Sequence, residues 1–403
     1  MRAMVWKTLL LSGMCLLLVA CSSNLRPLTE PDAVTASEME VPVIPDEAQA
    51  GQQPTTSSET ADEVQERGLT RVLPGGVSAG VFTAPPLTAV LGEFAIRTTK
   101  GYYLTAVNGG GRTADPTIIT ATMAPGPWER FKIAISNPGQ VYDKAFQTIN
   151  GNFVTVVGGG GRVSDVLHSD ATQVKDWERF HLTELNLSYP SFYGFQTIKG
   201  NFVTAVGAGG KYDNAIHTDA TVINEWERFR IVKCGDPGSG NEYGIMGASG
   251  QFLLAENARG RSQGTVILSG PRALETKFTF LKQSDGTYAF QTSTGSNFVT
   301  ALQGGGLVQK YQDPDCGMFS ACIGGFSTIF HTDATQVQGW EKFKIIDQGN
   351  CTYAIQTTSG FFMGIYKDPS GRMSLTTRRD GASTPNEKFQ LVVYGLGSPV
   401  VIQ

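Results

Sequence analysis

The sequence lacks the excess of positive charge that a nucleic-acid-binding protein needs. Its 403 residues carry a formal net charge of −4. Residues 22–68 hold ten acidic and two basic side chains, which leaves residues 69–403 near +2 once the positive charges of the leader are set aside. A nearly neutral body offers no basic field to a polyanion, so we expect no nucleic-acid partner.

The sequence also lacks a recognisable catalytic constellation. Its titratable residues, which include only 4 histidines, form no Ser-His-Asp pattern, no metal-ligand cluster and no close carboxylate pair. The stretch Gly76–Gly80 (GVSAG) formally matches a nucleophile elbow. That elbow needs a strand before it and a helix after it, whereas Pro74 and Pro85 flank this stretch. We therefore expect no enzyme, no cofactor and no metal.

Residues 1–20 read as an export signal that ends in the apolar run Leu9–Ala20, which is too short to span a bilayer. The motif Val19-Ala20-Cys21-Ser22 resembles a bacterial lipoprotein signal. The resemblance implies that Cys21 becomes a lipidated N-terminus, and serine after the cysteine favours the outer membrane of the cell envelope. The alternative is a plain secretory signal with an incidental cysteine.

Residues 21–68 form the next segment, rich in Pro, Ser, Thr, Glu and Gln and almost without aromatic side chains. Such a composition cannot bury enough apolar surface to offset the entropy of ordering. We expect a disordered acidic tether between the anchor and the body.

The body is organised around one stretch, Tyr193–Cys234, which recurs with variation six times between Glu93 and Tyr394. Successive copies start about 45 to 51 residues apart, except that the fifth carries the insertion Lys310–Phe326 and extends over 65 residues. A repeat of this length predicts stacked or symmetry-related supersecondary units.

Each copy reads as four short strands, and no stretch has a sustained helical period. Asn150-Gly151 and Lys199-Gly200 predict tight hairpin turns between the first two strands. The fourth strand alternates, as in Phe229 and Ile231, so one of its faces is expected to be buried. The alternate residues Arg228 and Arg230 are expected on the wet face. The body is therefore all-β.

Four-stranded repeats could close as one six-bladed propeller or as two β-trefoils of three copies each. The strands are short for propeller blades. The pattern G-x-F-V-T-A-V-x-G-G-G followed by D-A-T-x(4)-W-E-[RK]-F resembles the fascin-like β-trefoil family over about 300 residues. The resemblance implies two tandem trefoils, with the first domain at residues 69–236 and the second at 237–403. Glu275 and Asn386 depart from the pattern by replacing the tryptophan.

The tryptophans of this motif are candidate ligand-binding residues, because an aromatic face suits a sugar ring. They are Trp128, Trp177, Trp226 and Trp340. A large residue at a symmetric position more often caps a barrel or fixes a hairpin, so we expect a structural role. The glutamate that follows each tryptophan is expected to pair with the next Arg or Lys.

Three histidines share another repeat position, before S-D-A-T or T-D-A-T: His168, His217 and His331. Imidazoles beside carboxylates can bind metal. Equivalent positions of a three-fold barrel lie on separate lobes, however, so we expect polar residues at strand ends that share no ion.

The Gly-rich links between the second and third strands are not phosphate loops, because no helix follows and the G-K-[ST] ending is missing. They include the candidate ligand contacts Asn108, Arg112, Arg162 and Lys211. Whether these links serve as plain turns or as turns that let the backbone approach a ligand stays open.

Four cysteines remain in the body: Cys234, Cys316, Cys322 and Cys351. In an exported protein an even set predicts disulfides, with three possible pairings. Cys316 with Cys322 would close a small loop, and Cys234 with Cys351 would link the two trefoils.

Together these features predict a non-catalytic binding or adhesion protein at the cell envelope. A glycan is the leading ligand, and the family resemblance adds modules found beside glycosidases. The alternative is a protein-binding scaffold or a filament-binding module that contacts a cell-surface protein. Fold alone does not decide between them.

Overall fold

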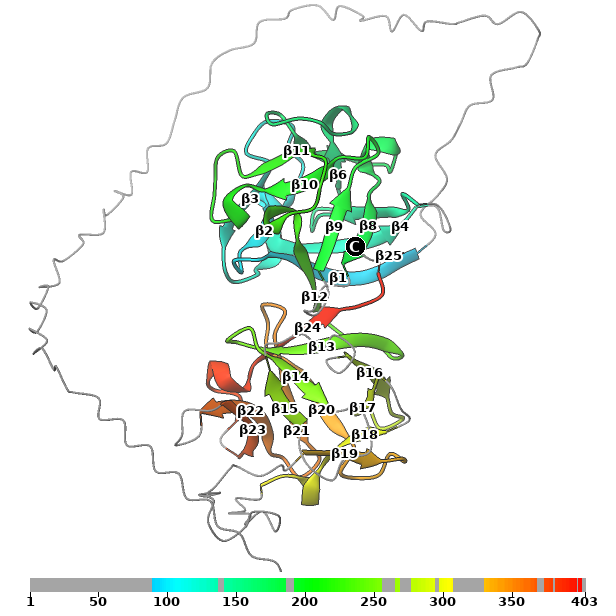
Figure 1. Ribbon diagram of the computed structural model, residues 1–403, viewed down its shortest axis with the longest axis vertical. Coiled ribbons are helices and arrows are strands. Elements are labelled where there is room, and N and C mark those ends of the chain that lie inside the picture. The colour runs from blue at the N-terminus through cyan, green and yellow to red at the C-terminus, as the bar shows by residue number, and fades with distance from the viewer. Residues whose placement is uncertain are drawn as a thin grey trace, which may run out of the picture. The chain divides into compact units, whose positions relative to one another are not determined.

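The computed structural model describes residues 89–136, 141–185, 192–255, 265–268, 277–293, 297–306, 330–367, 373–379, 381–396 and 398–400 (Figure 1). All of them belong to one compact unit, Ala79–Gln403. The expected signal peptide, the tether, the lipidation site Cys21 and the pair Cys316 and Cys322 lie outside the described residues.

In the first half of the body, the described residues form twelve strands. They are β1 (Ala89–Thr98), β2 (Tyr103–Ala106), β3 (Ile118–Thr122), β4 (Arg130–Ile135), β5 (Lys144–Gln147), β6 (Phe153–Val156), β7 (Leu167–Ala171), β8 (His181–Leu185), β9 (Phe192–Gln196), β10 (Phe202–Ala205), β11 (Ile216–Ala220) and β12 (Phe229–Cys234).

These strands form a six-stranded barrel capped by three hairpins. The barrel is closed by the pairs β1–β4, β4–β5, β8–β9, β9–β12 and β12–β1, with a bridge between Lys144 and Phe180 joining β5 to the start of β8. The hairpins are β2–β3, β6–β7 and β10–β11. This is the architecture of a β-trefoil.

The three hairpins are joined in a ring by backbone hydrogen bonds. Each Gly-rich link exchanges two bonds with the third strand of another repeat: Gly111 and Arg112 with Ser169, Gly161 and Arg162 with Thr218, and Gly210 and Lys211 with Thr120. The third link returns to the first repeat, so the cap closes with three-fold symmetry.

The second half repeats this plan. Its strands are β13 (Asn241–Gly247), β14 (Phe252–Ala255), β15 (Thr265–Leu268), β16 (Lys277–Lys282), β17 (Tyr288–Thr292), β18 (Phe298–Ala301), β19 (Phe330–Ala334), β20 (Phe343–Asp347), β21 (Tyr353–Thr357), β22 (Phe362–Lys367), β23 (Met373–Arg378) and β24 (Phe389–Val393). The pairs β13–β16, β16–β17, β17–β20, β20–β21, β21–β24 and β24–β13 close a second barrel. The all-β, β-trefoil fold expected from the sequence is therefore confirmed, whereas the number of tandem repeats and the domain limits stay predictions.

The alternating residues of the fourth strands fill the barrels. Phe229 and Ile231 are fully buried, and Phe229 stacks on Phe195 with ring centroids 4.9 Å apart. Phe280, Phe290 and Phe343 form a comparable cluster in the second trefoil. The predicted strand phase is correct.

Strands of the two trefoils also pair with each other. Val232 of β12 faces Val392 of β24 in antiparallel register, so β1, β12, β24 and β13 form a continuous sheet. A further strand, β25 (Ser398–Val400), pairs in parallel with Thr183–Leu185 of β8. The repeat pattern gave no sign of either pairing.

The expectation of a wet face on β12 is wrong at Arg230. Its guanidinium lies 4.3 Å from the ring centroid of Phe192 and 5.4 Å from that of Phe252, which belongs to the second trefoil. The outer face of β12 is covered there by a neighbouring domain instead of water.

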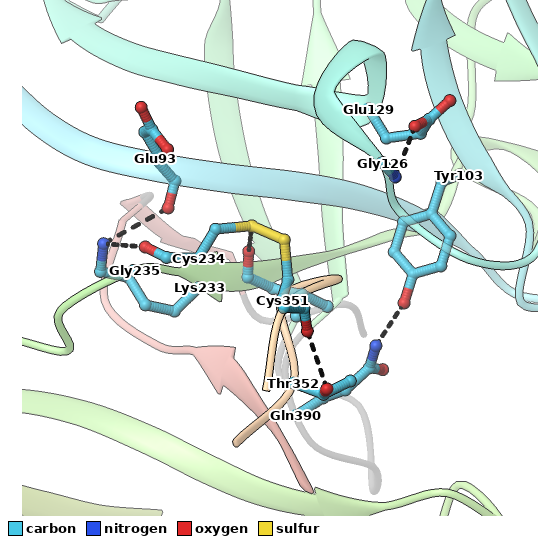
Figure 2. Close-up of a disulfide and its surroundings, with 12 residues drawn as sticks. Glu93, Tyr103, Gly126, Glu129, Lys233, Cys234, Gly235, Cys351, Thr352 and Gln390 are labelled. Atoms are coloured by element: carbon cyan, nitrogen blue, oxygen red, sulfur yellow. Dashed lines mark hydrogen bonds between the residues drawn. A yellow bond between two sulfur atoms is a disulfide. The ribbon is translucent and has the colours of Figure 1, made fainter. Parts of the chain in front are cut away.

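A disulfide joins Cys234, at the end of β12, to Cys351, just before β21 (Figure 2). This is one of the pairings that the sequence allowed. Nearby, the Tyr353 hydroxyl donates to the carbonyl oxygens of Lys233 and Gly235, at 3.1 and 2.7 Å. Lys233 donates to the carbonyl oxygens of Glu93 and Cys234, and its burial lowers the pKa of its ammonium group. These contacts satisfy the buried Tyr353 hydroxyl and Lys233 ammonium groups beside the bridge.

Candidate functional site

The four tryptophans are half-exposed, with 45–48% of each residue accessible to solvent. Three lie in the middle of 3₁₀ turns just before a barrel strand: η2 (Pro127–Glu129), η4 (Asp176–Glu178) and η6 (Glu225–Glu227). Because each residue is partly buried and partly open to solvent, the expected structural role and the ligand-binding alternative both stay predictions.

A buried glutamate holds each of these turns in place. Glu178 accepts hydrogen bonds from the Thr155 hydroxyl and from the backbone N–H of Lys175, both at 2.7 Å. Glu227 is held in the same way by Thr204 and Asn224, and Glu341 by Thr300 and Gln338. Glu129 accepts from the backbone N–H of Gly126 at 2.6 Å. The expected pairing with the next Arg or Lys is wrong.

The two residues of each Trp-Glu pair therefore have different roles. A buried charge-assisted hydrogen bond is geometrically specific, so the carboxylate fixes the turn from inside. The adjacent indole is thereby presented outward in a defined position. The threonine partner lies 23 residues before the glutamate in two repeats, and that recurring Thr-to-Glu spacing is the signal from which this contact could have been found.

Each tryptophan-bearing turn lies against the Gly-rich turn of its own repeat: η1 (Val107–Gly109), η3 (Val157–Gly159) and η5 (Val206–Ala208) contact η2, η4 and η6. At Gly159, which has φ +76°, an added Cβ would lie 2.8 Å from Ile198 and 3.5 Å from Trp177. At Gly160, with φ +114°, it would collide with Thr197. The glycines therefore allow the next repeat to approach closely, and whether the links also contact a ligand stays open.

The hairpin turn of another repeat completes each surface. Asn150 donates through its backbone and side chain to the carbonyls of Gly109 and Asn108, at 3.2 and 2.9 Å. Lys199 donates through its backbone to Gly159 at 3.2 Å, and Lys100 through its ammonium to Gly207 at 2.9 Å. The exposed Ile149 and Ile198 stand in two of these turns.

We name these three surfaces the lobe clusters. Each comprises a tryptophan, a Gly-rich turn and a hairpin turn: Trp128 with Asn108–Gly109 and Ile149–Asn150, Trp177 with Gly158–Gly159 and Ile198–Lys199, and Trp226 with Gly207–Ala208 and Thr99–Lys100. Their hairpin residues were missed from the sequence, although an isoleucine inside the recurring turn sequences T-I-N-G and T-I-K-G was a signal. An aromatic face beside amide, ammonium and hydroxyl groups suits an amphiphilic ligand.

The candidate residues of the Gly-rich links make hydrogen bonds and ion pairs within the first trefoil. Arg112 donates through Nε to the carbonyl of Pro116 at 3.2 Å. Arg162 forms a 3.2 Å ion pair with Asp165. Lys211 contributes its backbone N–H and carbonyl to Thr120. Asn108 has φ 58° and offers its carbonyl to Asn150.

The histidines are placed separately, each paired with its own hairpin. His168 Nε2 lies 2.8 Å from Asp165, and His217 Nε2 lies 2.7 Å from Asn214. His331 stands in the second trefoil, with Nδ1 4.0 Å from Asp333. Among the described residues, no group of three or more His, Cys, Asp or Glu side chains could hold a metal ion.

A hollow of about 300 Å³ opens at the capped end of the first trefoil. It is lined by segments from all three repeats: Asp115–Ile118, Val163–Ser164 with Val166–Leu167, and Tyr212–Ile216. Its volume is at the lower limit for small-molecule pockets. The links carrying Arg112, Arg162 and Lys211 lead into it, and the side chains of Arg162 and Lys211 also lie near Gly158 and Gly207 of the Gly-rich turns.

In the second trefoil, Trp340 is exposed to the same extent as the others, and the Thr358 hydroxyl donates to Gly339 at 2.9 Å. Glu387, which follows Asn386, is buried and accepts from the backbone of Thr384 at 3.0 Å. The anchoring glutamate is therefore retained in the sixth repeat, where Asn386 replaces the tryptophan. In the part of the chain that the structure describes, no helix is long and apolar enough to cross a membrane.

No family model and no curated protein matches the sequence. Several solved structures are similar in fold. A mosquitocidal holotoxin has a TM-score of 0.31 and 8% identity, with 75% of this chain and 34% of that chain covered. The designed three-fold symmetric protein ThreeFoil has a TM-score of 0.28 and 14% identity, with 38% and 99% covered. The BEL β-trefoil has a TM-score of 0.29 and 11% identity, with 40% and 97% covered.

Proposed function

We propose that the protein is a non-catalytic carbohydrate-binding protein whose lobe clusters hold the ligand. One observation carries the proposal: the same half-exposed indole recurs on three lobes of the first trefoil, each fixed by a buried glutamate. A preorganised aromatic face loses little conformational entropy when it binds.

The chemistry of the lobe clusters favours a sugar over a purely apolar ligand. A pyranose presents C–H groups on one face and hydroxyls around its edge. The indole can cover the apolar face, while Lys199 or Lys100 and the carbonyls of the Gly-rich turn can bond to the hydroxyls. Each surface is shallow, so we expect weak single sites that gain affinity when one glycan chain engages several lobes.

Removal of the three indoles tests this proposal. We expect Trp128→Ala, Trp177→Ala and Trp226→Ala each to cost about 1 kcal/mol of binding, roughly fivefold in affinity, and the triple variant to lose most of it. A glycan array identifies the ligand for the full mature chain, and calorimetric titration gives the affinities. Because the rings are half-exposed, the melting temperature should change little.

Two matched variants sharpen the test. Trp340→Ala makes the same change in the second trefoil and should cost less affinity, since only the first trefoil retains all three tryptophans. The triple change of Arg112, Arg162 and Lys211 to alanine tests the Gly-rich links. If it abolishes binding while the tryptophan variants bind normally, the ligand lies at the links instead of the indoles. Failure of the intact chain to bind any glycan would favour the alternative of a protein partner.

We further propose that lipid attached to Cys21 anchors the protein to the outer membrane, with the acidic segment 21–68 as its tether. The lipoprotein-like motif around Cys21 supports this localisation. Two acyl chains are needed for stable anchoring, so loss of the modified cysteine should free the protein. We expect Cys21→Ser to move the protein from the membrane fraction to the soluble fraction, as measured by fractionation and immunoblotting. A variant that stays fully membrane-bound would contradict the anchor.

A further inference from the structure

Two arginines lie directly opposite each other in the first trefoil. Arg97 of β1 faces Arg230 of β12 in antiparallel register. Like charges at directly opposed positions of a sheet destabilise it unless another group compensates them. This pair therefore needs a counter-charge.

The described residues around the pair supply none. Arg97 Nη1 lies 3.6 Å from the sulfur of Met246, and Arg230 Nη1 lies 4.0 Å from the same atom. The Nε atoms of both arginines are buried and have no hydrogen-bond partner among the described residues. Burial and the charge of Arg97 lower the pKa of Arg230 to about 10, while the Tyr394 phenol acts in the opposite direction. Arg230 is still a cation at neutral pH, so the site keeps two positive charges.

The internal repeats show that Arg97 is a local departure. The equivalent residues Gln147, Gln196 and Gln356 each donate to the carbonyl of the hairpin glycine four residues later, at 2.8–3.1 Å. In the fourth repeat this position is Met246, the residue that both arginines contact. The two departures from glutamine thus meet where the trefoils meet, and neither has an obvious role in folding a single trefoil.

Hydrogen-bonding groups of the second trefoil border the same place. Gln390 occupies in β24 the repeat position that Arg230 occupies in β12, and it lies opposite Met246. Its Nε2 donates to the hydroxyl of Tyr103, drawn in Figure 2. The Tyr103 hydroxyl still carries a proton to donate.

We propose that Arg97 and Arg230 form a binding site for a tetrahedral oxyanion, phosphate or sulfate, either free or carried on a sugar. Two planar guanidinium groups match the paired oxygens of such an anion, and charge-assisted hydrogen bonds to it would satisfy the Nε atoms. The anion supplies the counter-charge that the sheet lacks. The site is separate from the lobe clusters and does not depend on the proposed function.

Titration of the full mature chain with inorganic sulfate and phosphate, at constant ionic strength set with chloride, tests the site. We expect saturable binding by calorimetry and a rise in melting temperature that chloride does not give. Arg97→Gln installs the residue of the sister repeats and should fold normally, yet lower the affinity about tenfold or more, as should Arg230→Gln. Arg97→Lys keeps the charge without the paired donors and should fall between.

Lys132→Gln is the matched control, because Lys132 is exposed and holds the position of Arg230 in the first repeat. It removes the same charge and should leave sulfate binding unchanged. Three results would overturn the proposal. The first is equal sulfate affinity in the wild type and Arg97→Gln, and the second is an equal loss of sulfate affinity in Lys132→Gln and Arg230→Gln. The third is the absence of saturable binding by either anion. Glucose 6-phosphate serves as the second probe: tighter binding than inorganic phosphate identifies a sugar-borne anion, and equal or weaker binding identifies a free one.

Discussion

Replacement of Phe229 by alanine is expected to lower the free energy of unfolding by about 3–5 kcal/mol, the usual cost of truncating a large core side chain. Phe229 is fully buried in the barrel of the first trefoil and stacks on Phe195, which also packs against Phe146. The truncation leaves a cavity in a ring of aromatic contacts that cannot collapse without moving several strands. Chemical denaturation monitored by circular dichroism measures the loss.

The control for this variant must lie on a face that water reaches. Arg230 does not qualify, because it packs against Phe192 and Phe252. Lys132→Ala does qualify: its side chain is exposed, and it should cost less than about 0.5 kcal/mol. Comparable costs for the Phe229 and Lys132 variants would mean that the strand phase described here is wrong.

The sequence predicted the strand faces well because a strand has a period of two. Phe229 and Ile231 repeat at that period and both are buried. The hairpin turns could be predicted equally well from their glycines, because Gly151 and Gly200 adopt φ values of 88° and 87° that other residues avoid. Both signals depend on neighbouring residues only, and each recurs in several repeats, so every repeat supports the prediction made for the others.

What the sequence did not predict depends on contacts between distant residues. The alternation of apolar and polar side chains in β12 distinguishes its two faces. It does not show whether the polar face meets solvent or another domain, and for this reason the sequence predicted a solvent-exposed Arg230. Glu227 was assigned to the adjacent arginine because that neighbour is local, whereas its hydrogen-bond donor Thr204 lies 23 residues away. The repeat position of the tryptophans suggested a structural role, but that position does not show that the buried glutamate beside each of them anchors the turn.

Loss of the Cys234–Cys351 disulfide is the other large effect that we expect. The bridge spans 117 residues, and it restricts the unfolded chain over that whole loop. The double variant Cys234→Ala and Cys351→Ala should lower the free energy of unfolding by about 2–5 kcal/mol, because bridges across long loops remove the most chain entropy. Both cysteines are buried, so alanine avoids leaving a hydroxyl without a partner.

Denaturation midpoints with and without reductant measure this contribution. Reductant should lower the midpoint of the wild type toward that of the double variant and should leave the double variant almost unchanged. The matched control replaces Cys316 and Cys322, whose bridge would close only a short loop and should therefore contribute less by the same chain-entropy argument. The hydrogen bonds from Tyr353 to Lys233 and Gly235 remain in all these variants, so the comparison isolates the covalent link. If the double variant and the oxidised wild type unfold at the same midpoint, the bridge does not stabilise the junction, and the β12–β24 pairing and the Tyr353 hydrogen bonds hold the trefoils together without it.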